Sequence, residues 1–399
     1  MLKDKLLAAY DKEYPIMLLK ELIAIPSETP PGEIVAIIKR IETEMRELGF
    51  KTEIVAKRPE KPNVIATLNP DSPGPTVVLY AHADCASIGE ENKNLWTMDP
   101  YGGEIKDGKI FGNGAADAKS GIAQLIGACK TIIDSKIPLK GKIIFIASAD
   151  GEKGDLEGAK WMYENGLLPK ADFGINADAS NLRIQHIFRG RAFYTLTVEG
   201  KVAHSNTPQL GINAISKMAK VIKAIDDARL SFKPHPIIPD STKTFTTIQG
   251  GTKPNSMPAR CQATLDVRLV PGQTIAGVTA ELEAILDKLR DEDPELKVKL
   301  ELMEFGAREV IEFPSDCRIV KEANRAFEEI TGQKADNGAG PGSAGCIMYF
   351  ANLGIPSIFF GPARLETAHQ PDEFCSIENL DIATKVTALT VARIVAEGE

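Results

Sequence analysis

The sequence predicts an α/β protein with a mostly parallel sheet flanked by helices, and an inserted α+β domain. Near-continuous apolar runs such as 76–81 and 142–147 alternate with helical periodicity in the first part of the chain. Such strands are typical of a parallel sheet that helices cover on both faces. Near residue 188 the pattern changes to half-polar strands, and the first pattern resumes after residue 303. One domain therefore interrupts another.

The elements of the first domain follow from their periodicity. Helices are expected over residues 3–23 and 33–48, from the residue after Asp117, and over 155–165, 316–331, 344–353 and 377–396. Strands are expected over residues 52–57, 63–68, 76–82, 142–147, 173–175 and 356–360. These elements predict one discontinuous domain built from residues 1–187 and 304–399.

The inserted segment 188–303 shows a different order of elements. Its strands are expected at 193–198, 242–248, 263–270 and 296–302, and its helices at 211–228 and 275–291. The order β-α-β-β-α-β predicts a ferredoxin-like domain, in which two helices cover one side of a four-stranded sheet. Because the chain enters and leaves this domain at two crossings, near residues 188 and 303, we expect it to act as a lid.

Charge and composition exclude several classes of partner. The 399 residues carry a net charge of -8, which argues against nucleic acid or an anionic membrane as the main partner. No apolar run reaches the roughly 20 residues that cross a bilayer, and the N-terminus lacks a signal-peptide pattern. The six cysteines form no Cys-x-x-Cys pair, which favours reduced thiols. These features predict a cytoplasmic protein.

Side chains that bind metals follow the predicted parallel strands. The carboxyl ends of such strands face one crevice, where residues distant in sequence meet. Two imidazoles and three carboxylates can hold two divalent ions. The candidate ligands are His82, Asp117, Glu152, Asp178 and His369.

Five motifs in order give the chain a resemblance to a known family over nearly its whole length. It resembles the co-catalytic metal amidohydrolases that include acetylornithine deacetylase, succinyl-diaminopimelate desuccinylase, aminoacylase and glutamate carboxypeptidase. No single motif is specific to this family, but the order of all five motifs around an inserted domain is specific. The motifs are His82-Ala83-Asp84, Gly112-Asn113-Gly114-Ala115-Ala116-Asp117, Glu152-Lys153-Gly154, Ala203-His204-Ser205 and Ala368-His369.

The resemblance implies a role for each candidate ligand. Asp117 is expected to bridge two ions, with His82 and Asp178 completing one and Glu152 and His369 the other. The mixed imidazole and carboxylate set favours Zn²⁺, with Co²⁺ or Mn²⁺ as alternatives.

The resemblance also implies two supporting features of this site. Asp84 is expected to accept the other ring N–H of His82 and so to fix its tautomer. A cis peptide bond is expected between Asp117 and Ala118.

Three residues of the inserted domain match substrate contacts of the family. His204 is expected to reach the partner's site across a homodimer and to stabilise an oxyanion there. Asn255 is expected to contact substrate, and Arg268 to hold a substrate carboxylate by forked hydrogen bonds. The alternative for His204 is a surface histidine or one whose hydrogen bonds are satisfied in the core, and the alternative for Arg268 is a solvated strand charge.

One catalytic position departs from the resembled pattern. The carboxylate that takes a proton from water is expected beside Glu152, where this chain has Gly151. General acid–base help is typically worth 10²–10⁴-fold in rate. The chain is therefore a natural inactive relative, an inactivated form of an active enzyme, or an enzyme in which Asp150, Glu152 or a substrate group is the base. Asp150 is disfavoured because neighbouring residues of an extended segment point in opposite directions.

The function expected from the sequence is zinc-dependent hydrolysis of amide bonds in N-acyl amino acids or small peptides, of the deacylase or carboxypeptidase type. Gly151 places that activity in question. One alternative is a catalytically inactive protein that binds metal and ligand on the same fold. Another is a di-zinc aminopeptidase, against which the His204 motif in an inserted domain counts.

Overall fold

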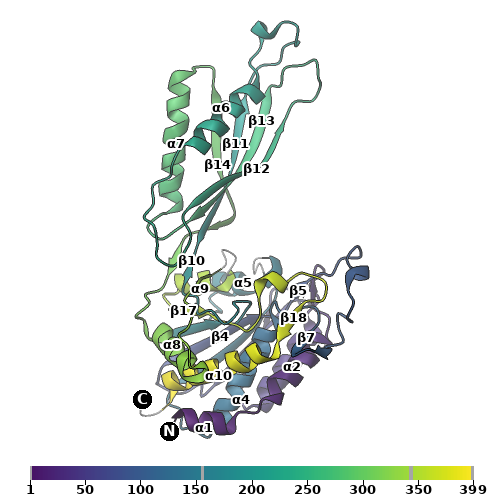
Figure 1. Cartoon of the computed structure of the whole chain (residues 1–399), viewed down its shortest axis with the longest axis vertical. Coiled ribbons are helices and arrows are strands. Elements are labelled where there is room, and N and C mark those ends of the chain that lie inside the picture. The colour runs from purple at the N-terminus through teal and green to yellow at the C-terminus, as the bar shows by residue number, and fades with distance from the viewer. Residues whose placement is uncertain (1, 154–156, 341–344, 397–399) are drawn as a thin grey trace. The chain divides into compact units, whose positions relative to one another are not determined.

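The computed structural model describes residues 2–153, 157–340 and 345–396 (Figure 1). The chain divides into two compact units. The first contains Met1–His186 and Phe313–Glu399, and the second contains Ile187–Glu312. Each unit has a hydrophobic core of its own.

The first unit is built on a six-stranded sheet, and its strand order is β17-β9-β4-β8-β3-β2. The four strands from β17 to β8 are parallel, whereas β3 and β2 are antiparallel to their neighbours. The sheet is therefore mostly parallel, as predicted. Its strands are β2 (Lys51–Ala56), β3 (Pro62–Leu68), β4 (Thr76–His82), β8 (Lys142–Ser148), β9 (Phe173–Asn176) and β17 (Ser357–Phe359).

Helices cover both faces of this sheet. Val77 and Leu79 of β4 belong to one core cluster, and Val78 and Tyr80 belong to another on the opposite face. This alternation explains why β4 is an unbroken apolar run. The helices are α1 (Leu2–Ala9), α2 (Glu13–Ile23), α3 (Val35–Glu47), α4 (Lys119–Asp134), α5 (Ala159–Glu164), α8 (Arg318–Thr331), α9 (Gly345–Asn352) and α10 (Ile377–Val395).

The single helix expected over residues 3–23 is two helices. Pro15 has no amide hydrogen to donate to the carbonyl of Asp11, and the side chain of Asp11 instead accepts the amide of Glu13 at 3.0 Å. The helix therefore restarts at Glu13.

The short strands of the first unit are β1 (Glu28–Thr29), β5 (Cys85–Ala86), β6 (Ile105–Lys106), β7 (Lys109–Phe111), β16 (Ala339–Gly340) and β18 (Phe374–Ser376).

The second unit has the predicted ferredoxin-like order. Its antiparallel sheet runs β12-β13-β11-β14, and α6 and α7 pack on one face (Figure 1). On the other face, most side chains of β11 and β13 are polar or charged. The elements are β11 (Gly190–Glu199), α6 (Ala214–Asp227), β12 (Thr242–Gly250), β13 (Arg260–Leu269), α7 (Ile275–Glu292) and β14 (Lys297–Arg308).

The expected boundary at residues 303–304 lies inside β14 and is wrong. This strand continues to Arg308, where it pairs with Arg191 of β11. The boundary lies at Glu312, in β15 (Ile311–Glu312), which pairs with β10 (Ile187–Phe188). Among the described residues, no helix is both long and apolar enough to cross a membrane.

Candidate metal centre

The five predicted ligands converge in the first unit, and we call this group the metal centre. His82 is the last residue of β4, and Glu152 lies in the short helix η2 (Gly151–Lys153) after β8. Asp178 follows β9, Asp117 precedes α4, and His369 follows η4 (Leu365–Thr367). Parallel strands that end at one edge of the sheet bring these residues together.

Asp117 lies between the two imidazoles. Its Oδ1 is 2.8 Å from Nε2 of His82, and its Oδ2 is 3.5 Å from Nε2 of His369. His369 Nε2 also lies 3.1 Å from the Glu152 carboxylate, and His82 Nε2 lies 3.8 Å from Asp178 Oδ2. The side chains form two triads, each with its ligand atoms within 4.8 Å of one another, and Asp117 belongs to both.

The imidazoles hold protons strongly when no metal is bound. Burial opposes protonation of His82, but hydrogen bonds to Asp117 and Asp84 outweigh it and raise the His82 pKa well above its usual value. Hydrogen bonds to Asp117 and Glu152 raise the pKa of the half-exposed His369 to about 10. The ring atoms involved, Nε2 of His82 and Nε2 of His369, are the two that face Asp117.

The pKa values of two carboxylates in the metal centre shift in opposite directions. Burial and the nearby charge of Asp117 raise the pKa of Asp178 well above its usual value. Burial also disfavours ionisation of Asp117, but its hydrogen bonds with His369 and His82 hold its pKa far below the usual range. Three carboxylates and two imidazoles form a donor set of the kind that divalent transition metals take, so the residues present fit two such ions.

Asp84 has a wider role than the one expected from the sequence. Nδ1 of His82 lies 2.9 Å from the backbone carbonyl oxygen of Asp84, and the Asp84 carboxylate is further away at 3.4 Å. The carboxylate also accepts the amides of Gly151 at 2.8 Å and Glu152 at 3.3 Å. The carbonyl and the carboxylate of Asp84 therefore both face the Nδ1 side of the His82 ring. A ligand of each triad is held by Asp84.

Gly151 packs directly against a ligand. A Cβ atom at this position would lie 2.2 Å from Cγ of His82, closer than any real contact. The α-carbon therefore faces the imidazole, and the present backbone leaves no room for a side chain. This contact gives a steric reason for glycine that sequence analysis did not detect.

Asp150 is engaged elsewhere. Its carboxylate forms an ion pair of 2.5 Å with Lys61, and both side chains are at least 95% buried, with exposures of 3% and 5%. Asp150 also has a left-handed backbone with φ of 61°. Since Lys61 holds the carboxylate, Asp150 is a poor candidate for the base.

Two further acids of the site were missed. Glu373 accepts the amides of Ala116 at 2.7 Å and Asp117 at 3.1 Å, and burial raises its pKa to about 7. The neighbouring Asp372 accepts the amide and hydroxyl of Thr97. The sequence signal was an acidic pair closely following a ligand histidine.

The peptide between Asp117 and Ala118 is cis, which confirms the expectation.

The substrate residues predicted in the second unit do not form one group. His204 is exposed and bridges to Ser256, and the amide of Ser205 donates to the carbonyl of Asn255 at 3.1 Å. Arg268 lies near the other end of β13, ion-paired with Asp266 at 2.9 Å. His204 and Asn255 are thus neighbours, and Arg268 is remote from them.

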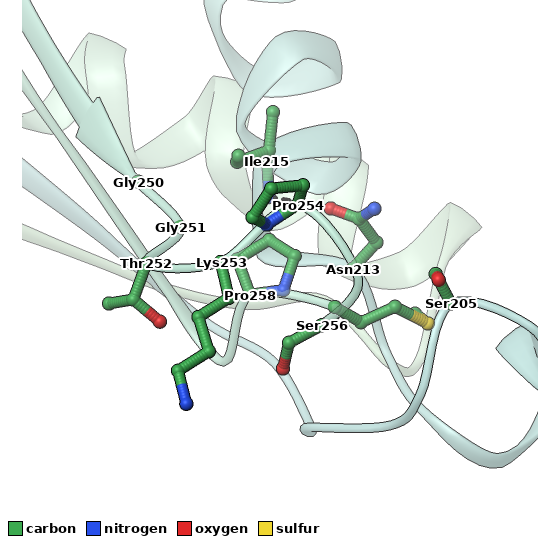
Figure 2. Close-up of a pocket in the computed structure, with 11 residues that line it drawn as sticks. Ser205, Asn213, Ile215, Gly250, Gly251, Thr252, Lys253, Pro254, Ser256 and Pro258 are labelled. Atoms are coloured by element: carbon green, nitrogen blue, oxygen red, sulfur yellow. Dashed lines mark hydrogen bonds between the residues drawn. The ribbon is translucent and has the colours of Figure 1, made fainter.

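A pocket of about 480 Å³ lies beside Ser205, the residue after His204. Figure 2 shows that its lining comes from the loop of Ser205, from the start of α6 at Asn213, and from the segment 250–258. The side chain of Asn213 also accepts two amides of the first turn of α6, so it caps that helix.

A metal-type donor set at the strand ends of an open α/β sheet, with an inserted ferredoxin-like domain, defines a metal-dependent hydrolase. The sequence matches the family model described as Peptidase family M20/M25/M40 over residues 78–393. The chain belongs to this family.

Relatives and solved structures agree over almost the whole chain. An acetylornithine deacetylase of Photorhabdus laumondii is 28% identical over 93% of this chain and 94% of the relative. The N-formyl-4-amino-5-aminomethyl-2-methylpyrimidine deformylase of Bacillus subtilis is 28% identical over 94% of this chain and 93% of its own length. The aminopeptidase PepT of Bacillus cereus has the same fold, with a TM-score of 0.77 and 23% identity over 96% of this chain and 99% of that chain.

Proposed function

We propose that the protein binds two divalent metal ions and hydrolyses amide bonds in N-acyl amino acids or small peptides. The observation that carries this proposal is Asp117, which belongs to both ligand triads. Two relatives whose names describe removal of an acetyl and a formyl group support a deacylase. The mixed donor set favours Zn²⁺, with Co²⁺ or Mn²⁺ as alternatives.

The residues of the chain have distinct tasks in this reaction. When bound, the two ions polarise a carbonyl oxygen and lower the pKa of a water molecule. Asp117 would hold both ions, and Glu373 fixes the backbone of Asp117 by accepting the amides of Ala116 and Asp117. The carbonyl of Asp84 orients His82 so that its Nε2 faces Asp117.

Proton transfer is the weak step of the proposed reaction. Gly151 provides no carboxylate, and the other acids near Glu152 are already engaged: Asp150 by Lys61, and Asp84 by two amides. We therefore propose that turnover is slow. The contact between Gly151 and His82 specifically favours a second candidate, a protein that binds metal and ligand without turnover.

We further propose that the protein acts as a homodimer. Arg268 lies eight positions beyond Arg260 in β13, which is about 26 Å along a strand. A small substrate held by Arg268 cannot also touch His204 of the same chain, which supports the use of His204 and Asn255 at a partner's site. The edge strand β12 and the exposed Ile248 offer a surface for that partner.

The proposed compartment is the cytoplasm. All six cysteines lie in the described part of the chain, and none forms a disulfide bond.

Burial raises the pKa of the Cys85 thiol to about 11, so this thiol beside the metal centre is no nucleophile.

The test of this function compares Gly151→Glu with Gly151→Ala, because both variants add the Cβ that crowds His82. Each protein is loaded with Zn²⁺, Co²⁺ or Mn²⁺, its metal content is measured, and it is assayed on a panel of N-acetyl amino acids. We expect Gly151→Glu to exceed Gly151→Ala by about 10²-fold in kcat at equal metal content.

The other outcomes separate the alternatives. Brisk turnover by the natural chain, with no gain in Gly151→Glu over Gly151→Ala, would show that the base lies elsewhere. Metal binding without hydrolysis by any of the three proteins would establish the non-catalytic candidate.

A further inference from the structure

Three arginines form a cross-strand row in the second unit, and we call it the arginine row. Arg191 of β11 is directly opposite Arg268 of β13 on one side and Arg308 of β14 on the other. Residues directly opposite in an antiparallel sheet share a face. Ala192 and Val267, their sequence neighbours, are in the core, so the row lies on the face opposite α6 and α7.

Such an arrangement works against the stability of the sheet. Like charges directly opposite each other in neighbouring strands are destabilising. Burial, and then the charges of Arg308 and Arg268, lower the pKa of Arg191. Asp266 pairs with Arg268 through Oδ2 at 2.9 Å. Among the described residues, Arg308 Nη1 is buried without a hydrogen-bond partner.

At the opposite end of the same three strands, residues of opposite charge face each other. There Arg260 of β13 faces Glu199 of β11, which faces Lys297 of β14. Charges alternate across these strands, and each cation has an anion opposite. This end of the sheet places a carboxylate between two cations. The arginine row places a third arginine in that middle position.

Neighbouring groups hold the guanidinium groups in place. The Phe193 ring lies 5.0 Å from Cζ of Arg191 and 6.0 Å from Cζ of Arg268. Arg191 Nε donates to the carbonyl of Gly306 at 2.8 Å. A preorganised row of guanidinium groups is suited to carboxylates, which it binds by forked hydrogen bonds.

We propose that the arginine row selects substrates with two or more carboxylates. Arg268 takes one carboxylate, as its motif implies, and Arg191 with Arg308 takes a second. The inference rests on the proposed function, since it names the substrate class of that hydrolase: an N-acyl amino acid or small peptide with an acidic acyl group or an acidic side chain. Arg191 and Arg308 are then specificity-determining residues.

The test measures binding to the full-length, metal-free protein by calorimetry at low and physiological salt. The probes are N-succinyl-L-glutamate, with three carboxylates, and N-acetyl-L-alanine, with one. We expect the first probe to bind at least about tenfold tighter, and the difference to shrink as salt rises.

Variants assign this preference to the row. Arg191→Gln and Arg308→Gln should each remove most of it, and Arg308→Lys should retain part of it because the charge stays while the fork is lost. Arg260→Gln, on the same strand and face as Arg268, is the matched control and should keep the full preference. Thermal melts verify that each variant is folded.

Equal affinity for the two probes, no binding of either at millimolar concentration, or an unchanged preference in Arg191→Gln and Arg308→Gln would overturn the proposal. Because the protein is metal-free in this experiment, the result is independent of hydrolysis. Failure of the proposed function would appear instead as absent metal binding or absent turnover.

Discussion

The metal centre and the arginine row both gather like charges, but by different structural means. In the metal centre, three carboxylates are interleaved with two imidazoles, and Asp117 serves both triads. In the arginine row, three guanidinium groups lie side by side with one ion-paired carboxylate, Asp266. The first depends on a single residue shared by both triads, and the second divides carboxylate binding among three arginines. The two sites should therefore respond differently to single substitutions.

The largest effect is expected from Asp117→Ala. Because both triads include Asp117, this variant should lose both ions, whereas removal of one arginine should weaken anion binding only about tenfold. Metal per chain is measured by mass spectrometry after Zn²⁺ loading and desalting, with Arg260→Gln as the control. If Asp117→Ala retained two ions, the metal centre would not depend on this shared residue, and the contrast with the arginine row would be wrong.

The next effect concerns the second unit, which we expect to contribute to catalysis without holding metal. His204→Ala should lower turnover by about 10²–10³-fold, the usual worth of one oxyanion donor, at unchanged metal content. Mixing His204→Ala with Asp117→Ala should restore activity, because a heterodimer has one site with all its groups. No recovery after subunit exchange, or a monomer in light scattering, would contradict the dimer.

A smaller effect is expected from Asp84→Asn. Its carboxylate accepts two amides of the segment that carries Glu152, and an amide side chain can accept through only one atom. We expect Zn²⁺ affinity to fall about 10- to 100-fold, as for other residues that orient metal ligands. The matched control is Asp134→Asn on the surface of α4, which pairs with Lys130 and should have no effect.

The smallest effect is a dependence on pH. Hydrogen bonds to Asp117 and Glu152 raise the pKa of His369 to about 10 from its usual value of 6.5. Its protonated form therefore stabilises the metal-free fold fully below pH 6.5, and this contribution is lost as the pH rises towards 10. Metal must displace that proton, so Zn²⁺ affinity should rise with pH across this window.

Calorimetry in buffers of different ionisation enthalpy measures the protons released on Zn²⁺ loading. We expect His369→Gln to release about one proton fewer at pH 8. Equal proton release from the two proteins would show that His369 is already neutral in the metal-free state.

The sequence predicted the features that depend on strand ends. The ligands were found because apolar strands stop at polar residues, and parallel strands stop at one edge. The steric role of Gly151 was not predictable, because it depends on how closely His82 approaches across two strands. The arginine row was hidden for a similar reason: β14 extends beyond the expected end at residue 302, and the register of β11 and β14 shifts between Arg191 and Phe193.

Asp84 has a consequence for the order in which ions enter the site. Its backbone carbonyl orients His82, a member of one triad, and its carboxylate holds the amide of Glu152, a member of the other. When one ion fixes His82, the segment of Glu152 loses freedom as well, so the second ion meets a site that is already ordered. The two binding events are therefore thermodynamically linked, and we expect Zn²⁺ uptake to be cooperative, with few chains that hold a single ion.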